Sequence, residues 1–279
     1  MTALSVSLGG RGVAGLVVAI VAVGLAAWWR SLHPSNERSW SPDQAVMPRV
    51  SVTGDQVRIE GVRNFHWRSA TEGDPAWESR TYPLDGVATV WYVLVPFSSV
   101  WRGPAHAFVS FGFDDGRYLA ISIEARREAG ERYGLIAGLL RRFELLYVVG
   151  DERDLIGRRA VYDGTDVFLF PVRADRAAVR ALLVAMLRRA EDLRQHPEFY
   201  NTLTNNCTLN IVRQVNAVVP GTIPVSWRIV LPGYSDEVAR RLGLIPGGAD
   251  PAAGRERFRI NQRARAALDA PDFSARIRQ

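Results

Sequence analysis

The sequence predicts an α+β fold in which an antiparallel sheet packs against helices, preceded by one membrane-spanning helix. Three observations support this prediction. Short β-prone runs follow one another between residues 50 and 173, two amphipathic helical patterns come after them, and a long uncharged segment lies near the N-terminus. With 279 residues, of which 47% are hydrophobic and 23% charged, the chain is long enough for one well-buried core.

The net charge of +6 comes entirely from arginine, because the sequence contains no lysine. A basic total can indicate binding to nucleic acid or to anionic lipid. The arginines are spread along the chain and form no block, so we expect no nucleic-acid partner. The single cysteine excludes an internal disulfide. Since no phosphate-binding loop, dinucleotide glycine motif or Cys/His metal spacing is present, we expect no cofactor and no bound metal.

The N-terminal segment Val13–Trp29 contains no charged residue and is bracketed by Arg11 and Arg30. Its length is at the short end for a helix that crosses a bilayer, and tryptophans beside an arginine are typical of an interfacial anchor. We therefore predict a membrane anchor over residues 1–30 that contacts lipid, followed by a tether over residues 31–49.

A cleaved signal peptide is the alternative for this segment, since Gly24-x-Ala26 resembles a cleavage pattern. A first helix of the soluble core is disfavoured, because the segment has no polar face.

The predicted domain, residues 50–246, is built largely from strand-like segments. They are residues 50–53, 57–62, 87–97, 106–113, 118–124, 143–150 and 167–173. The first two flank a Gly54-Asp55 turn, and the third is apolar enough for a central strand buried on both faces. Residues 69–85 are expected to form a loop.

The fourth and fifth segments form a hairpin whose register can be derived. Both strands alternate, and their apolar sets must share the core face. A three-residue loop that ends with Gly116 in the left-handed conformation meets this requirement. It places Phe108 opposite Ser122 and His106 opposite Glu124, with Cβ atoms about 5 Å apart. We therefore predict a His–carboxylate pair; an exposed, unrelated His and Glu is the alternative.

A helix predicted over residues 206–218 begins at the only cysteine. Asn and Thr, which cap helix N-termini, precede apolar residues at helical spacing. Cys207 should then lie in the first turn, where free N–H groups and the helix dipole favour a thiolate. Its own amide would be suited to stabilising an oxyanion. A small buried cysteine without chemistry is the alternative.

A second helix is predicted over residues 174–195, with an apolar stripe opposite its charged residues. His196 is interpreted as the end of this helix rather than as a second base. The acidic cluster at residues 151–154 is expected to be a solvated turn. Residues 247–279, polar and rich in Arg and Ala, are expected to form a weakly ordered basic tail.

Cys207, His106 and Glu124 supply the residue types of a nucleophile, a base and a group that orients the base. The histidine strand precedes the cysteine helix in the chain. This order is similar to that of the circularly permuted papain-like enzymes of the NlpC/P60 and lecithin–retinol acyltransferase group, which implies a permuted papain-like fold.

A closer resemblance lies in three segments, HAFVSFGFDDGRYLAISIEAR, ELLYVVGDERDLIGRR and EFYNTLTNNCTLNIVRQVN. Together with flanking residues between 40 and 244 they resemble the family catalogued as the Lnb N-terminal periplasmic domain. The family pattern retains His106, Glu124, Asn206 and Cys207. The resemblance implies a bacterial envelope protein with a single span in the inner membrane and its soluble domain in the periplasm. The family label comes from an accessory protein linked to lacto-N-biosidase production, so it implies a location more than a reaction.

Two functions follow as hypotheses. In the first, the protein is a thiol hydrolase or acyltransferase that acts on an amide or ester of an envelope peptide, lipid or protein. Cys207 would be the nucleophile, His106 the general base and then acid, Glu124 the orienting group and Asn206 an oxyanion donor. In the second, the protein is a non-catalytic accessory or folding factor that uses the same scaffold to bind a partner.

Overall fold

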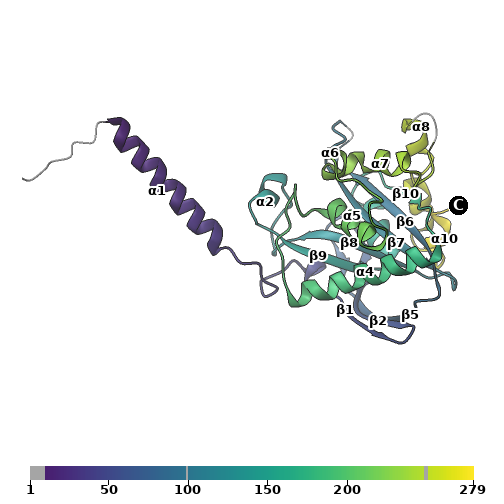
Figure 1. Cartoon of the computed structure of the whole chain (residues 1–279). Coiled ribbons are helices and arrows are strands. Elements are labelled where there is room, and N and C mark those ends of the chain that lie inside the picture. The colour runs from purple at the N-terminus through teal and green to yellow at the C-terminus, as the bar shows by residue number, and fades with distance from the viewer. Residues whose placement is uncertain (1–9, 99, 248–250) are drawn as a thin grey trace, which may run out of the picture. The chain divides into compact units, whose positions relative to one another are not determined.

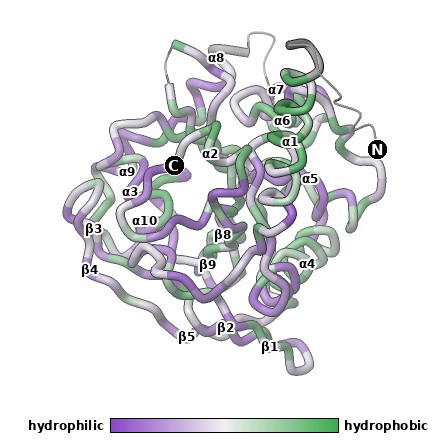
Figure 2. Tube along the Cα trace, turned by 90° about the vertical axis from the view of Figure 1, so that its left-hand side faces the viewer, coloured by the Kyte–Doolittle hydropathy of each residue, from purple (hydrophilic) through white to green (hydrophobic). Residues whose placement is uncertain are grey.

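The computed structural model describes residues 10–98, 100–247 and 251–279. The chain divides into two units, Met1–Ser35 and Asn36–Gln279. The first unit contains helix α1 (Gly10–Ser31), whose residues Val13–Ser31 are long and apolar enough to cross a membrane. Figure 2 colours most of this helix as hydrophobic. A signal sequence has the same length and composition, so both readings of this segment remain consistent with the helix.

An eight-stranded sheet organises the second unit (Figure 1). Its path is β1-β2-β9-β8-β7-β6-β10, with β5 paired to β2. The strands are β1 (Arg49–Thr53), β2 (Gln56–Arg63), β5 (Trp77–Pro83), β6 (Val87–Pro96), β7 (Ala105–Phe113), β8 (Tyr118–Arg126), β9 (Glu144–Gly150) and β10 (Phe168–Pro171). All neighbours are antiparallel except β2 and β9, which meet in parallel at Arg63 and Gly150. The sheet is therefore mixed, although the predicted antiparallel pairing is correct elsewhere.

Strands β5 and β4 (Gly73–Asp74) correct the loop expected over residues 69–85. Strand β4 pairs with β3 (His66–Trp67) in a separate two-stranded sheet. The β5 sequence is mostly polar, but Tyr82 is fully buried and the strand pairs with β2 along its length. Its polar side chains are tolerated because most of them are only partly buried.

One face of the sheet is covered by α4 (Arg176–Gln195) and α5 (Cys207–Val218), which lie on the near side in Figure 1. Asp175 caps α4 by accepting a hydrogen bond from the Ala178 N–H at 2.7 Å. The apolar stripe of α4 is buried against β6, β9 and α5, as predicted. Shorter helices complete this side. They are α2 (Leu135–Leu139), α6 (Trp227–Val230) and α7 (Ser235–Arg241).

The opposite face of the sheet is covered by the C-terminal residues, so the expectation of a weakly ordered tail is wrong. They form α8 (Pro251–Glu256), α9 (Asn261–Ala267) and α10 (Phe273–Arg276). Ile260, Ala264 and Ala267 follow each other at helical spacing and are buried with Phe273 and Ile277. These side chains pack with Phe108, Ala120, Leu146 and Val148 of the sheet. The apolar residues were too widely spaced among arginines for composition to reveal them.

The acidic cluster at residues 151–154 is also not a solvated turn. Asp154 is 0% exposed and accepts two hydrogen bonds of 2.8 Å from the Arg63 guanidinium. Its carboxylate also accepts from the Phe65 N–H and from the Trp67 indole. A buried carboxylate with four donors is stable, whereas the sequence pattern alone resembles a surface charge run. The chain continues into α3 (Arg158–Val161).

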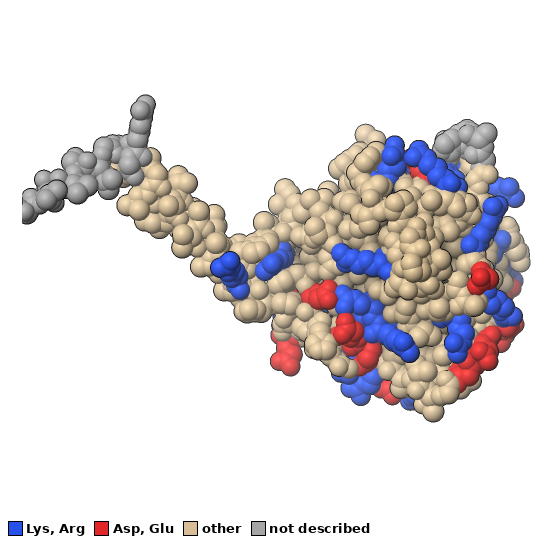
Figure 3. All heavy atoms as spheres, in the orientation of Figure 1, with Lys and Arg blue, Asp and Glu red and all other residues tan. Residues whose placement is uncertain are grey.

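On the face drawn in Figure 3, basic and acidic side chains are largely interspersed. On this face, the distribution matches the spread of arginines along the sequence.

Candidate functional site

The β7–β8 hairpin has the predicted register. Phe108 pairs with Ser122, and Gly116 has a φ of 79°, in the left-handed region. The paired ladder ends at this point, and the next residues outward on this face are His106 and Glu124. Their closest atoms, Nε2 of His106 and Oε1 of Glu124, lie 3.3 Å apart.

Ser122 connects the same two side chains, a role that sequence reasoning missed. Its hydroxyl donates to Glu124 Oε1 at 2.6 Å and accepts from Nε2–H of His106 at 2.7 Å. The proton on Nε2 leaves Nδ1 of the imidazole as the nitrogen that can accept a proton. The derived register already placed Ser122 on this face, and that was the only signal for its role.

Helix α5 begins at Cys207 because Asn206 caps it. The Asn206 Oδ1 accepts from the Leu209 N–H at 2.9 Å. Its Nδ2 donates to the carbonyls of Thr202 at 2.8 Å and Val230 at 2.9 Å. Both amide hydrogens are therefore used within the protein. Asn206 acts here as a cap and has no N–H left for an oxyanion, in contrast to the role expected from the sequence.

Cys207 is 3% exposed, and its sulfur lies 3.9 Å from the Thr208 hydroxyl. The His106 imidazole and the Ala107 backbone lie close enough to lower the pKa of the thiol. A strand and a helix start that are distant in sequence thus meet at the thiol. In the described part of the chain, neither the Cys207 nor the Thr208 backbone N–H has a hydrogen-bond acceptor.

The electrostatics of this group favour an ion pair between sulfur and imidazole. Burial alone would lower the pKa of His106, but the Glu124 carboxylate and the Cys207 thiol raise it to about 9. Burial alone would raise the pKa of Cys207, but the neighbouring His106 imidazole lowers it from the usual value of a thiol. Despite its burial, the pKa of Glu124 lies well below its usual range because of His106 and Arg159.

These residues line a cavity of about 320 Å³, called here the thiol cavity. Four arginines also line it, Arg63, Arg127, Arg158 and Arg159. Arg159 donates to Glu124 Oε1 at 2.7 Å and to the Leu155 carbonyl at 2.7 Å, so it holds the same carboxylate oxygen that lies nearest His106. No pattern in the sequence singled out Arg159.

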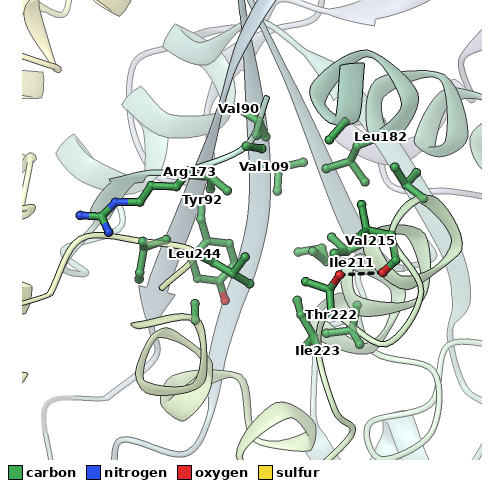
Figure 4. A pocket seen from close by; sticks show the side chains of 18 of the residues that line it. Val90, Tyr92, Val109, Arg173, Leu182, Ile211, Val215, Thr222, Ile223 and Leu244 are labelled. Carbon is green, nitrogen blue, oxygen red and sulfur yellow. Dashed lines mark hydrogen bonds between the residues drawn. The ribbon is translucent and has the colours of Figure 1, made fainter. Parts of the chain in front are cut away.

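A second cavity, about 370 Å³ in volume, lies farther along α5 and is called here the aliphatic cavity (Figure 4). Its walls come mainly from β6, β7, α4 and α5, and include Val90, Val109, Leu182, Ile211 and Val215. Figure 4 shows the Arg173 guanidinium pointing away from this space. Cys207, His106 and Glu124 are not among its lining residues.

His196 lies outside both cavities. It ends α4, with a side chain 74% exposed and Nδ1 3.1 Å from Asp192 Oδ1. This position agrees with its interpretation as a helix-end residue. Among the described residues, no group of three or more His, Cys, Asp or Glu side chains is placed to hold a metal ion.

Comparison with known proteins places the site in a family. Neither the curated proteins nor the solved structures contain a match to the chain. The family of Lnb N-terminal periplasmic domains matches residues 73–233, a range that includes His106, Glu124 and Cys207. A periplasmic domain and one N-terminal apolar helix together fit a single-span membrane protein. Because the match covers more than half of the chain, the protein belongs to the Lnb N-terminal periplasmic domain family.

Proposed function

We propose that the protein is a thiol hydrolase or acyltransferase, anchored in the inner membrane, that acts on an ester or amide in the periplasm. The observation that carries this proposal is the meeting of Cys207, His106 and Glu124 in one cavity. The cysteine at a helix start and the histidine on a strand also support a circularly permuted papain-like arrangement. The family match supports the periplasmic location but assigns no reaction.

The proposed reaction starts from the thiolate–imidazolium pair. The Cys207 sulfur attacks the substrate carbonyl carbon and forms a C–S bond. The bond from this carbon to the leaving oxygen or nitrogen breaks, and that atom takes a proton from the His106 imidazolium. Water, or an acceptor alcohol or amine, then gives a proton to His106 and attacks the thioester. The C–S bond breaks, and the thiolate is regenerated.

The first turn of α5 supplies the electrophilic part of the proposed site. A tetrahedral intermediate carries negative charge on oxygen and needs preorganised donors. The Cys207 N–H, free of other acceptors and at the positive end of the helix dipole, fits this role. Glu124 and Ser122 touch no substrate in this scheme; they hold the imidazole through Nε2 and leave Nδ1 free to exchange a proton.

Acyl-enzyme trapping tests the proposal. Full-length protein in detergent is mixed with p-nitrophenyl acetate, and we expect a burst of about one equivalent of nitrophenol and a gain of one acetyl group on Cys207 by mass spectrometry. Cys207→Ser is the matched control, expected to show neither. The rate of alkylation by iodoacetamide is followed against pH in parallel.

A protein that shows no burst and no acetyl adduct, and a thiol that is alkylated only above its ordinary pKa, would contradict the proposal. A Cys207→Ala variant that fully complements a deletion strain would then favour the accessory-factor hypothesis.

A further inference from the structure

Beside the thiol cavity lies an apolar groove of about 190 Å³, called here the side groove. Phe97, Ala105, Tyr133 and Tyr200 line both spaces. Cys207 lines the first space, and its neighbour Asn206 lines the second. The two spaces are therefore neighbours, and these four side chains form the boundary that a substrate occupying both would cross.

The side groove is bordered by large apolar side chains that remain exposed. Trp101 is 52% exposed, Ile136 73% and Leu203 49%. They come from three separate segments, the β6–β7 loop, α2 and the loop before α5. The surface over α2 carries no charged side chain in Figure 3. Exposed apolar residues that gather around a groove are typical of sites for lipids or other apolar ligands.

The thiol cavity, in contrast, offers guanidinium donors. Arg63 and Arg159 are occupied by Asp154 and Glu124, so they contribute little to a ligand. The Arg158 side chain, 20% exposed, makes no hydrogen bond within the described part of the chain. Its nearest carboxylates are Asp163 at 3.4 Å and Asp43 at 3.6 Å.

Arg158 is held in position without hydrogen bonds, because its guanidinium lies 4.2 Å from the centre of the Trp67 ring. Arg127 uses a single side-chain hydrogen bond, to Asp43 at 3.1 Å. Arg127 and Arg158 thus line one cavity with most of their donors unused, although Asp43 and Asp163 lie beside them. Guanidinium donors of this kind bind the oxygens of a phosphate group.

We propose that the substrate is an acyl ester of an anionic glycerophospholipid, with its acyl chain in the side groove and its phosphate on Arg127 and Arg158. This inference rests on the proposed thiol chemistry. The same chain contains an apolar helix that is long enough to cross a membrane. Such a helix would keep the protein at a bilayer, whose phospholipids are the source of substrate. Cys207 attacks the acyl carbonyl, the ester C–O bond breaks, and the lysophospholipid leaves with a proton from His106. Water then releases the fatty acid from the thioester.

Vesicle hydrolysis tests the inference with the full chain reconstituted in phosphatidylglycerol or in phosphatidylcholine. Both lipids carry the phosphate, but the choline cation of phosphatidylcholine is repelled by the two guanidinium groups, whereas the glycerol headgroup is not. We therefore expect free fatty acid to form about tenfold faster from phosphatidylglycerol. Arg158→Gln and Arg127→Gln are each expected to reduce this ratio to about two or less. Ile136→Ser is expected to reduce the rate from both lipids about three- to tenfold. Thermal melts of all variants establish that they are folded.

Surface variants far from the cavity serve as matched controls. Arg58→Gln on β2 removes an arginine that is half exposed, and Val52→Ser on β1 removes an exposed apolar side chain. Both are expected to keep the parent rates and the parent lipid ratio. If Arg58→Gln lowers the lipid ratio as Arg158→Gln does, or Val52→Ser lowers the rates as Ile136→Ser does, the changes result from general surface properties. The inference is then wrong.

The p-nitrophenyl acetate burst separates this inference from the proposed function. A parent protein that gives the burst but hydrolyses neither lipid, or hydrolyses both equally, retains its thiol chemistry and contradicts the phospholipid assignment. A protein that shows neither burst nor fatty-acid release contradicts both.

Discussion

The two cavities beside α5, the thiol cavity and the aliphatic cavity, differ in the chemistry of the side chains that line them. In the thiol cavity every group of the Cys207–His106–Glu124 set has a polar partner, and the pKa of each is shifted toward its charged form. In the aliphatic cavity the walls are mostly hydrocarbon and hold no such set. The same helix therefore contributes chemistry through its first turn and stability through the residues that follow. Substitutions at the two places should change different quantities, and this difference can be measured.

The largest effect is expected for Cys207→Ala. Loss of the nucleophile should reduce kcat on p-nitrophenyl acetate by at least about 10⁴-fold, while the free energy of unfolding changes by less than about 1 kcal/mol. Burst kinetics and urea unfolding measure the two quantities. Loss of stability without loss of turnover would reverse the assignment of roles to the two cavities.

Glu124→Gln is expected to lower kcat/KM about 10²-fold, because the imidazole loses the carboxylate that positions and charges it. The pKa of His106 is raised from 6.5 to about 9, so kcat/KM of the parent should fall as pH rises through about 9. Without the carboxylate this alkaline limb should move toward 6.5.

The free energy of unfolding should also depend on the protonation of His106, and it should fall as the pH rises. A raised pKa means that the contribution of the imidazolium is complete below 6.5 and is lost as the pH rises through about 9. The difference in unfolding free energy between parent and Glu124→Gln should therefore be larger at pH 6 than at pH 9.5. An unchanged pH profile of kcat/KM would show that Glu124 does not position His106.

Leu182→Ala enlarges the aliphatic cavity. Unlike Cys207→Ala, it should lower the free energy of unfolding and leave the thiol chemistry nearly unchanged. Loss of a buried leucine side chain is expected to cost about 2–3 kcal/mol in the free energy of unfolding. The acetyl-enzyme burst should remain within about twofold of the parent when measured well below the melting temperature. A large loss of burst amplitude in folded protein would indicate that the two cavities are coupled.

The smallest effect is expected for Asn206→Ser. Serine keeps an acceptor for the cap of α5 but removes both donors of the amide. The loss of the hydrogen bonds to Thr202 and Val230 should cost about 1–2 kcal/mol in stability. Because these donors are not available to a substrate, kcat should change by less than about threefold. A drop of 10²-fold or more in kcat would restore the oxyanion role for Asn206.

Alternation and capping in the sequence predicted the parts of this fold that depend on local pattern. The β7–β8 register followed from the requirement that two apolar sets share a face, and the start of α5 followed from Asn206. The parts that depend on distant partners could not be predicted in this way. Asp154 is buried because Arg63, Phe65 and Trp67 supply donors from another segment of the chain. A charge pattern does not reveal where its partners lie.

The candidate site also contains residues that local patterns predict and residues that depend on distant partners. Its three principal residues could be named from helix-start and strand-pair patterns, whereas their supporting groups could not. Ser122 lies between His106 and Glu124 as a consequence of side-chain rotamers, and Arg159 reaches Glu124 from a helix that follows a π-helical turn.

Helices α9 and α10 have a consequence for how firmly His106 is held. Arg278 donates to Glu152 at 2.8 Å, and Ile277 and Phe273 seal the sheet behind Phe108, the residue next but one to His106. The strand that carries His106 is thus backed by side chains that lie more than 150 positions later in the sequence. A cavity-forming substitution such as Phe273→Ala should therefore loosen this strand and disturb the imidazole without touching the thiol cavity.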